Sequence, residues 1–207
     1  MSRDIWDQRY SEAGEHYLFG LHPNAFLASQ QDLLLAGQRA LCVADGEGRN
    51  SVWLAQRGLL VDAVEFSPVA IAKARRLAAV RGLETHNPHF IEADLLSWDW
   101  PEARYDAVVA IFIQFVGPEA RQALFRRLVA ALKPGGRLFL QGYTPKQIEY
   151  GTGGPSAVEN LYTEALLREA FADMAIERLE SFDEVIEEGC GHRGMSALID
   201  LVAKKPL

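Results

Sequence analysis

Two glycines and a downstream carboxylate are the residues of this sequence best suited to chemistry. Gly46-Glu47-Gly48 follows an apolar run at 39–44 and precedes a helix-like pattern. Glycine lets a backbone approach a ligand closely, and a helix N-terminus presents N–H groups that lack intrahelical partners. Glu65 ends the next apolar run, where a carboxylate can accept hydrogen bonds from both hydroxyls of a ribose. Together they predict a nucleotide-like cofactor, although each alone would also suit an ordinary turn or a solvated strand end.

The residue types around the glycines leave more than one cofactor open. Gly46-Glu47-Gly48-Arg49-Asn50-Ser51 reads as G-x-G-x-x-S, which is close to a dinucleotide fingerprint. However, the sequence contains no Tyr-x-x-x-Lys pair, and we expect no second domain that could supply a hydride-transfer site. These observations disfavour a nicotinamide-dependent reductase, which stays as an alternative.

The elements that would position these residues alternate along the chain. Strands are expected at 39–44, 60–65, 89–93, 105–112 and 137–143, and helices at 51–57, 68–81 and 118–132. Ser67-Pro68 is typical of an N-cap followed by a first helical residue. The strands are continuous apolar runs, which indicates a parallel sheet buried on both faces. The predicted fold class is α/β, a Rossmann-like, doubly wound and mostly parallel sheet with helices on both faces.

The last third of the chain departs from this alternation. A helix is expected at 163–171, and two strands at 175–182 and 196–204 follow with no helix between them. Their connector at 183–194 is polar and contains three glycines, so we expect an antiparallel hairpin. Residues 144–162 are rich in Gly and Pro, and a long stretch of this kind inside a compact domain is often functional.

The motifs together resemble a known family. Residues 40–50, Ala-Leu-Cys-Val-Ala-Asp-Gly-Glu-Gly-Arg-Asn, resemble the first motif of class I S-adenosylmethionine-dependent methyltransferases. The closest likeness is to the small bacterial branch of tellurite-resistance and thiopurine methyltransferases. Val-Glu-Phe-Ser-Pro at 64–68, Glu-Ala-Asp-Leu at 92–95, Tyr-Asp-Ala-Val-Val at 105–109 and Leu-Lys-Pro-Gly-Gly at 132–136 agree with it. The resemblance spans 39–143 and implies seven strands with an antiparallel C-terminal pair.

The resemblance also implies a role for each residue of the cofactor site. The backbone from Asp45 to Gly48 would cradle the methionine moiety, and Glu65 would hold the ribose. Asp94 would accept the adenine amino group, beside a backbone N–H of Leu95, and Phe66 and Ile111 would sandwich the ring, although both also suit plain core packing. The expected set is Asp45, Gly46, Glu47, Gly48, Asn50, Glu65, Phe66, Ser67, Asp94, Leu95 and Ile111.

Two residues of the first motif depart from the family pattern. Cys42 stands where members carry Asp or Glu, and Ala44 stands where they carry Gly. The usual acid helps to hold the amino-acid end of the cofactor, so its loss predicts weaker binding or a shifted pose. Asp45 is a nearby substitute for that acid.

The residues that bind the methyl acceptor are expected in two segments, an N-terminal cap and a loop after residue 143. The aromatic residues of 6–24 would cover the cofactor, or alternatively pack on the sheet edge. His192-Arg193 would face an anionic substrate, or alternatively be solvated. The candidate pocket residues are Tyr10, Tyr17, Phe19, Phe112, Tyr143, His192 and Arg193. Methyl transfer is an in-line displacement that needs alignment more than proton transfer, so we nominate no catalytic base.

Length and composition set the remaining expectations. At 207 residues we expect a single domain, with a cap at 1–37, a cofactor-binding core at 38–143 and a substrate-side part at 144–207. A net charge of −7 disfavours nucleic acid as a substrate, and no apolar run is long enough for a membrane span. The N-terminus lacks the apolar region of a signal peptide. Cys42 and Cys190 suit neither a disulfide framework nor a metal site, so a reducing cytoplasm is expected.

The resulting hypothesis is an enzyme that methylates a small molecule and releases S-adenosylhomocysteine. The resemblance implies a thiol, a chalcogen oxyanion or a heterocycle as the acceptor and does not choose among them. A non-catalytic S-adenosylmethionine-binding sensor or partner subunit stays as a second alternative. The sequence does not indicate an oligomeric state.

Overall fold

The computed structural model describes residues 3–83 and 86–207 of the chain. The chain divides into two compact units. The first contains Met1–Trp98 together with Glu188–Gly191, and the second contains Asp99–Glu187 and His192–Leu207. The first two residues of the predicted N-terminal cap, Met1 and Ser2, lie outside the described residues.

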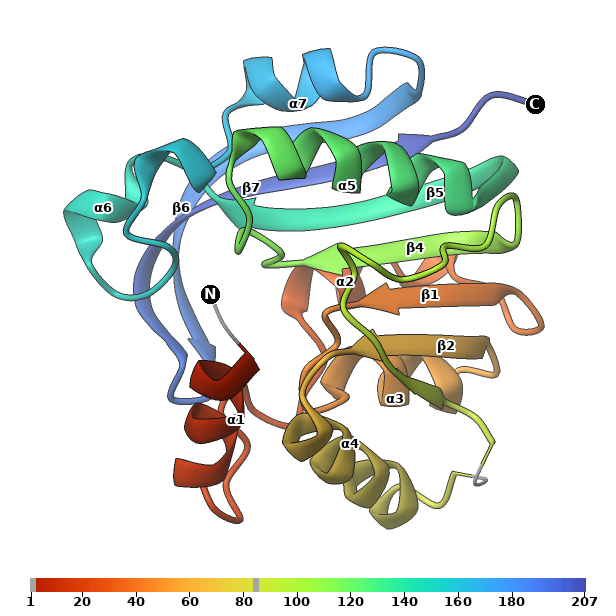
Figure 1. The fold of residues 1–207 in the computed structure, drawn as a ribbon. Coiled ribbons are helices and arrows are strands. Elements are labelled where there is room, and N and C mark those ends of the chain that lie inside the picture. Colours follow the sequence, from red (N-terminus) through yellow and green to blue (C-terminus); the bar gives the residue numbers. More distant parts are fainter. Residues whose placement is uncertain (1–2, 84–85) are drawn as a thin grey trace. The chain divides into compact units, whose positions relative to one another are not determined.

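The first unit is built on three parallel strands in the order β3-β2-β1 (Figure 1). Its elements are α1 (Arg3–Glu12), α2 (Ala25–Ser29), the 3-10 helix η1 (Gln31–Leu33), β1 (Arg39–Val43), α3 (Arg49–Gln56), β2 (Leu60–Glu65), α4 (Pro68–Val80) and β3 (His89–Glu92). The last four residues of β1 and the last five of β2 are buried, as expected for apolar runs in the middle of a sheet. The predicted start of α4 is confirmed, because Ser67 Oγ accepts a hydrogen bond from the N–H of Ala70 and Pro68 is the first helical residue.

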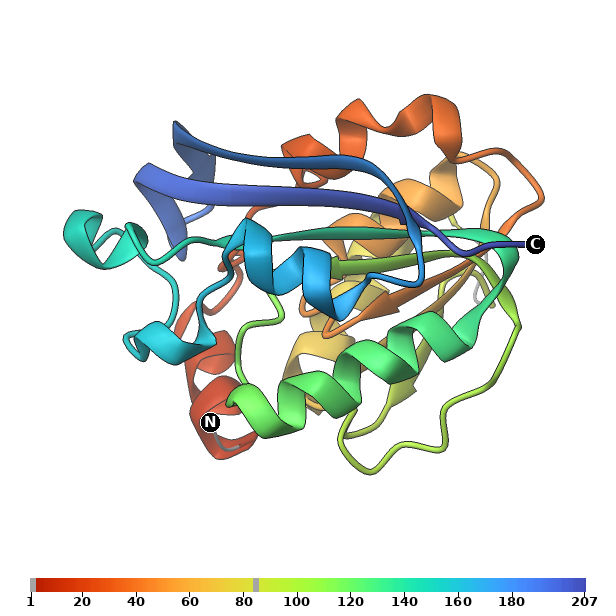
Figure 2. The same cartoon turned by 90° about the horizontal axis from the view of Figure 1, so that it is seen from above.

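The second unit contains the other four strands, in the order β4-β5-β7-β6. Its elements are β4 (Tyr105–Ile111), α5 (Pro118–Ala131), β5 (Leu132–Tyr143), α6 (Gln147–Tyr150), the 3-10 helix η2 (Val158–Asn160), α7 (Glu164–Ala170), β6 (Ala175–Glu188) and β7 (His192–Lys204). β5 pairs parallel with β4 and antiparallel with β7. Figure 2 shows α5 and α7 on the same side of these strands, where Phe125 packs on Tyr162 and Phe171 at ring-centroid distances of 5.6 and 4.9 Å.

The strand order of the whole chain, β3-β2-β1-β4-β5-β7-β6, is that of a mixed sheet with an antiparallel C-terminal end. The predicted Rossmann-like, mostly parallel α/β fold is therefore confirmed. Within residues 3–83 and 86–207 no helix is both long enough and apolar enough to cross a membrane.

The C-terminal hairpin is longer than predicted. Its strands extend through the polar stretch 183–194 and leave a turn at Gly189–Gly191. Phe182 and Ile186 pack against buried Tyr143, while the acidic residues between them are exposed. The prediction of a connector was wrong because an edge strand with one exposed face has the same polar composition as a loop.

A smaller difference concerns the segment Lys133-Pro134-Gly135-Gly136, which lies between the helix predicted at 118–132 and the strand predicted at 137–143. The structure includes it in β5, which begins at Leu132 opposite Tyr105 and then shifts register before Ala107 pairs with Arg137. Gly135 has a φ of +76°, a value typical of turns. The segment therefore forms an irregular start of the strand, where the pairing with β4 shifts.

A buried carboxylate lies within the second unit's sheet. Asp200 of β7 stands opposite Gln141 of β5, whose Nε2 donates to Asp200 Oδ1 at 2.7 Å. The guanidinium of Arg178 lies 3.2 Å from Asp200 Oδ2. Burial raises the pKa of Asp200 to about 6, and the hydrogen bond from Gln141 and the charge of Arg178 oppose this rise.

We expect Asp200→Asn to flatten the pH dependence of stability. Because the pKa is higher in the folded chain, stability from Asp200 is fully present below about pH 4 and is lost as the pH rises through 6. The loss is of the order of 2–3 kcal/mol. Urea unfolding at pH 4.5 and 7.5 should show this extra loss only in the wild type. Burial also raises the pKa of Asp45 to about 6. Because Asp45 is present in both the wild type and the variant, its contribution to the pH dependence cancels in the comparison. Equal losses in the two proteins would refute the effect.

Candidate functional site

The glycine turn lies between β1 and α3 in the first unit. Gly46 and Gly48 have φ values of +61° and +88°, which residues with a side chain rarely adopt. A Cβ on Gly48 would lie 2.7 Å from the Cβ of Ala74 in α4, and a Cβ on Gly46 would lie 3.1 Å from Tyr10 Oη. Both positions therefore require glycine, one for helix packing and the other for the close approach of a phenol.

Ala44 precedes these glycines and also has a left-handed backbone, with a φ of +49°. This conformation costs a non-glycine residue roughly 1–2 kcal/mol. The family's usual glycine at this position therefore has a conformational reason, and its replacement by alanine leaves strain in the turn.

Ala44→Gly is expected to stabilise the chain by about 0.5–1 kcal/mol, because relief of the strain exceeds the entropy that glycine adds to the unfolded chain. Ala103, exposed with a φ of +46°, is the matched position, and Ala103→Gly should give a similar gain. Ala40→Gly, in the extended strand β1, should instead destabilise. Thermal and urea unfolding measure all three, and a loss of stability in Ala44→Gly would contradict the assignment of strain.

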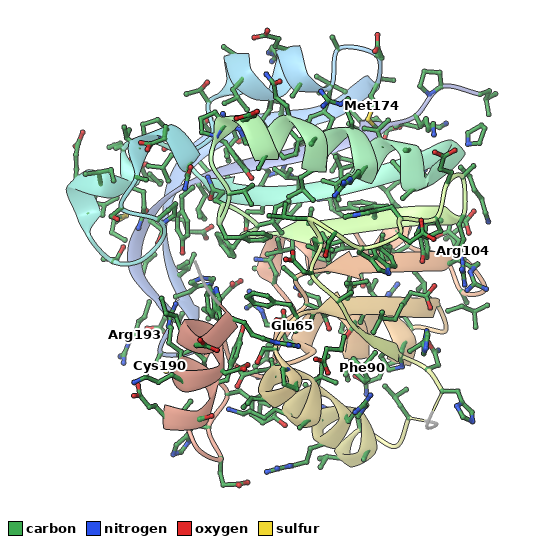
Figure 3. The ribbon with its side chains drawn as sticks, in the orientation of Figure 1. Glu65, Phe90, Arg104, Met174, Cys190 and Arg193 are labelled. Carbon is green, nitrogen blue, oxygen red and sulfur yellow. The ribbon has the colours of Figure 1, made fainter. Side chains whose placement is uncertain are left out.

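Glu65 is buried at the carboxyl end of β2 (Figure 3). Its Oε2 accepts a hydrogen bond from the N–H of Gly46 at 2.9 Å, and its Oε1 accepts from the N–H groups of Phe66 and Ser67, each at 2.9 Å. Burial raises its pKa, and these three hydrogen bonds oppose the rise. A carboxylate has about four acceptor positions, so one remains for a ligand hydroxyl beside the turn.

Asp45 is directed toward the helix that follows the turn. Its Oδ1 accepts from the N–H of Ser51 at 3.3 Å, and its Oδ2 accepts from the Ser51 hydroxyl. Cys42 is buried in β1, and its pKa is raised well above the usual range by burial and by the charge of Asp45. The thiol is therefore neutral and cannot replace the charge of the family's acid. Both carboxylate oxygens of Asp45 accept hydrogen bonds from Ser51 in the first turn of α3.

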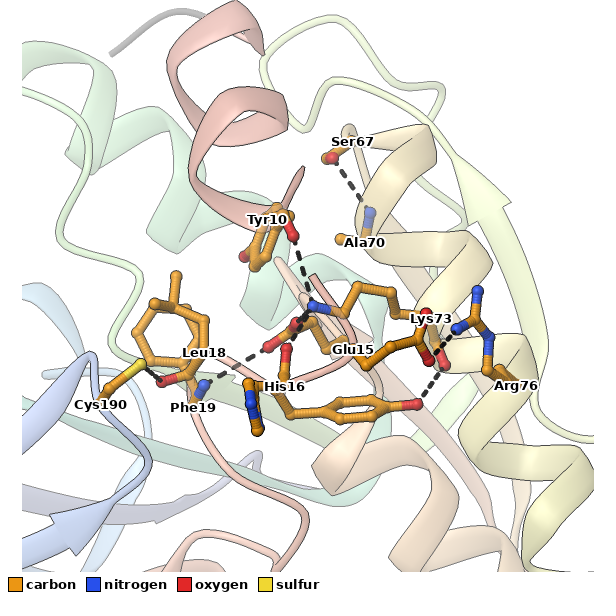
Figure 4. Close-up of polar contacts among 12 residues, drawn as sticks. Tyr10, Glu15, His16, Leu18, Phe19, Ser67, Ala70, Lys73, Arg76 and Cys190 are labelled. Carbon is orange, nitrogen blue, oxygen red and sulfur yellow. Dashed lines mark hydrogen bonds and ion pairs between the residues drawn. The ribbon is translucent and has the colours of Figure 1, made fainter. Parts of the chain in front are cut away.

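A buried ion pair lies beside the turn. Lys73 Nζ of α4 is 2.5 Å from Glu47 Oε1, and both side chains are almost fully buried. The same ammonium donates to the carbonyl oxygens of Tyr10 at 3.3 Å and His16 at 2.6 Å (Figure 4). The second oxygen of Glu47 accepts from the N–H of Phe19 at 3.4 Å. Lys73 thus joins the glycine turn to the N-terminal segment, a role that was not predicted from the sequence.

The N-terminal segment covers the turn with aromatic rings. Tyr10 is buried and stacks on Trp6 at 5.6 Å, with Phe19 edge-on to Tyr10 at 6.4 Å. Burial, followed by the charges of Glu65 and Glu47, raises the pKa of Tyr10 well above its usual value. Tyr10 and Phe19, which were predicted to line the pocket for the methyl acceptor, therefore lie together at the glycine turn.

Other contacts hold this segment on the turn. Asn50 Oδ1 accepts from the N–H of Asn24 at 2.9 Å, and the hydroxyl of Ser67 donates to Asp7. These contacts use the side chains of Asn50 and Ser67, which were both predicted for the cofactor. Tyr17 lies elsewhere: it packs against Val52 and Leu77, and its hydroxyl donates to the Lys73 carbonyl at 3.0 Å.

The hairpin turn also belongs to the first unit. Glu188 Oε2 lies 2.8 Å from Arg49 Nη2 at the start of α3, and Glu188 Oε1 accepts from Asn24 Nδ2 at 3.0 Å. The N–H of Gly191 donates to the carbonyl of Leu18 at 2.8 Å. Residues from the C-terminal quarter of the chain thus complete the surroundings of the turn. Neither Arg49 nor Glu188 was predicted, since nothing in their local sequence indicates a partner so distant.

The surroundings of the residues predicted to bind adenine indicate a site less clearly than those of Glu65 and Lys73 do. Asp94 follows β3, is exposed, and accepts from the N–H of Leu96 at 2.9 Å, while Leu95 is buried. Phe66 is half-buried, and its carbonyl accepts from Arg3 Nε at 2.7 Å. Ile111 ends β4 in the second unit. The roles of these residues toward adenine remain predictions.

Three of the predicted acceptor-side residues meet in the second unit. Phe112 stacks on Tyr143 with ring centroids 4.7 Å apart, and the His192 ring stands edge-on to Phe112 at 4.4 Å. Gln114 fixes this arrangement, because its Oε1 accepts from the N–H of Tyr143 at 2.6 Å and its Nε2 donates to the Tyr143 carbonyl at 2.9 Å. Arg193 is exposed (Figure 3). Gln114 was not among the residues predicted from the sequence.

Residues 40–136 match the family model of a methyltransferase domain. A demethylmenaquinone methyltransferase from Thermus thermophilus is 37% identical over 112 residues, which are 53% of this chain and 49% of that relative. The chain thus spans about half the length of this curated relative.

Solved structures resemble the whole chain. TehB from Haemophilus influenzae superposes with a TM-score of 0.72 at 16% identity, over 97% of this chain and 67% of that one. Magnesium protoporphyrin IX methyltransferase from Synechocystis with bound SAH gives 0.65 at 19% identity, over 98% and 82%. At these identities the structures show a shared fold. The family match over residues 40–136 agrees with the predicted methyltransferase domain.

Proposed function

We propose that this chain, whose residues 40–136 match a methyltransferase domain, uses S-adenosylmethionine to transfer a methyl group to a small-molecule acceptor. The observation that carries this proposal is the buried Glu65 carboxylate bonded to the N–H of Gly46, which sets a ribose acceptor beside a glycine turn. A thiol, a chalcogen oxyanion and a heterocycle are the acceptor classes to test. The net charge of −7 favours a small molecule over nucleic acid.

The residues of the first unit suit binding and orientation. The cofactor supplies a methyl group on a positively charged sulfur. The turn at Asp45–Gly48 would hold its amino-acid end, Glu65 its ribose and Asp94 its adenine, while Trp6, Tyr10 and Phe19 would exclude water. Because the pKa of Tyr10 is raised, its hydroxyl stays protonated at neutral pH and serves as a hydrogen-bond donor, not as a base.

Calorimetric titration with S-adenosylmethionine and S-adenosylhomocysteine tests the cofactor site. We expect both to bind, and absence of binding at millimolar concentration would refute the proposal. Transfer of a labelled methyl group to thiols, selenite, tellurite and aromatic heterocycles then tests catalysis.

A second candidate is a non-catalytic S-adenosylmethionine sensor. The observations that favour it are the neutral, buried Cys42 and the strained Ala44 in place of the family's acid and glycine. Binding without methyl transfer to any acceptor of the panel would support the sensor, whereas turnover with any one acceptor would exclude it.

A further inference from the structure

The three rings of Phe112, Tyr143 and His192 form a group, here called the ring cluster, at one end of the second unit's strands. Phe112 directly follows the last residue of β4, Tyr143 is the last residue of β5, and His192 is the first of the antiparallel strand β7. In open α/β sheets ligands bind outside the carboxyl ends of the parallel strands. The ring cluster therefore lies at the ligand-binding end of β4 and β5.

The ring cluster is only partly covered by the rest of the second unit. Tyr143 is buried, while Phe112 and His192 are half-buried. Phe182 and Ile186 of β6 are also half-buried and pack on the same buried group. A ring cluster that served only the core would be covered like Phe125 and Phe171 in the same unit, which are almost completely buried. The half-buried rings instead extend an apolar surface beyond the core.

The backbone beneath the ring cluster is held in an unfavourable conformation. Phe112 has a φ of +55°, a left-handed value that is costly for an aromatic residue. Its N–H donates to the carbonyl of Gln141 at 2.8 Å, and Gln114 binds the backbone of Tyr143 on both sides. Strained residues held in place by their surroundings concentrate at functional sites. The strain aims the Phe112 side chain while β4 and β5 keep their register.

The chemistry of the ring cluster favours one ligand class. Phe112 stacks on Tyr143 with an interplanar angle of 28°, and His192 stands at 62° to Phe112. Offset stacking and edge contacts of this kind are how planar aromatic molecules pack on protein rings. An oxyanion would need cationic partners, whereas the rings of the cluster contact one another, and the apolar side chains of Phe182 and Ile186 pack on the same group. The neighbouring cation, Arg193, is exposed.

We propose that the ring cluster binds a planar aromatic molecule as the methyl acceptor. This inference rests on the proposed function and narrows it, because it selects an aromatic acceptor over a small thiol or a chalcogen oxyanion. Phe112 and His192 supply the contact surface, and Gln114 is a positioning residue that acts through Tyr143.

The test compares two bicyclic probes of the same skeleton, 2-naphthol and its saturated counterpart decahydro-2-naphthol. Calorimetry or saturation-transfer NMR on the full chain, without cofactor, measures their binding. We expect 2-naphthol to bind at least fivefold more tightly than the saturated alcohol. Phe112→Leu keeps an apolar side chain on the same left-handed backbone but removes the ring. It should weaken the binding of 2-naphthol about 3- to 10-fold. His192→Leu should weaken it as well, and His192→Phe should restore it.

Phe90→Leu is the matched control, since Phe90 is half-buried in β3 of the first unit, and it should leave the affinity for 2-naphthol unchanged. Thermal unfolding checks that each variant folds. Equal binding of the two probes, or unchanged affinity in Phe112→Leu, would overturn the inference even if S-adenosylmethionine binds and the proposed function holds. Binding of 2-naphthol by a chain that does not bind S-adenosylmethionine would overturn its role as a methyl acceptor site.

Discussion

Lys73→Met is expected to destabilise the chain by about 3–5 kcal/mol, because it leaves the Glu47 carboxylate buried without its cation. Glu47 and Lys73 are both almost fully buried, and the ammonium also donates to two carbonyl oxygens of the N-terminal segment. Urea unfolding gives the change in free energy. Hydrogen exchange should show faster opening of residues 10–19, because their link to α4 is lost.

Arg76→Met is the matched control for this variant. Arg76 follows Lys73 on α4 and also pairs with the N-terminal segment, through Glu15 at 2.8 Å, but both side chains are exposed. Such a pair contributes less than about 1 kcal/mol. The double variant Lys73→Met with Glu47→Gln removes both charges and should recover much of the lost stability. A small loss in Lys73→Met, comparable with that of Arg76→Met, would show that the buried pair does not hold the segment.

Glu65→Ala should weaken S-adenosylmethionine by roughly 1.5–3 kcal/mol, or about 10- to 150-fold in Kd, because hydrogen bonds to a charged acceptor are among the strong ones. The same change leaves the N–H groups of Gly46, Phe66 and Ser67 without their acceptor, so stability should also fall. Glu65→Gln, which keeps one acceptor oxygen, should lose less of both. Calorimetry well below the unfolding temperature of each variant separates affinity from stability.

Glu92→Ala is the control for Glu65→Ala. Glu92 stands opposite Glu65 in the β2–β3 register, is half-exposed and pairs with Arg3. Its removal should change the Kd for S-adenosylmethionine by less than a factor of about two, since a surface ion pair is weak. Unchanged affinity in Glu65→Ala would remove this carboxylate from the cofactor site.

The features that could be predicted from the sequence depend on neighbouring residues. The start of α4 follows from Ser67-Pro68, and the strand ends at Glu65 and Tyr143 follow from apolar runs beside polar or glycine-rich segments. The glycine turn and its carboxylate were predicted for the same reason. In each case the chemistry that decides the structure lies within a few residues of the element.

The features that were missed depend on partners far along the chain. Lys73 lies beside the apolar positions Ala70, Ala74 and Leu77, so the helical pattern alone would assign it to a solvated edge. Its burial follows from Glu47 and from two carbonyls of the N-terminal segment. The packing of Tyr17 against Val52 and Leu77 was not predicted, because an aromatic residue in a segment without periodicity carries no information about which hydrophobic group it joins.

The hairpin turn at Glu188–Gly191 has a consequence for the order in which the chain is made. This turn belongs to the same compact unit as residues up to Trp98, and its Glu188 is the counterion of Arg49 at the start of α3. During synthesis from the N-terminus, the glycine turn leaves the ribosome long before that counterion exists. The surroundings of the glycine turn therefore form completely only after residues 188–191 have been made, and the N-terminal residues of the first unit cannot complete these contacts by themselves.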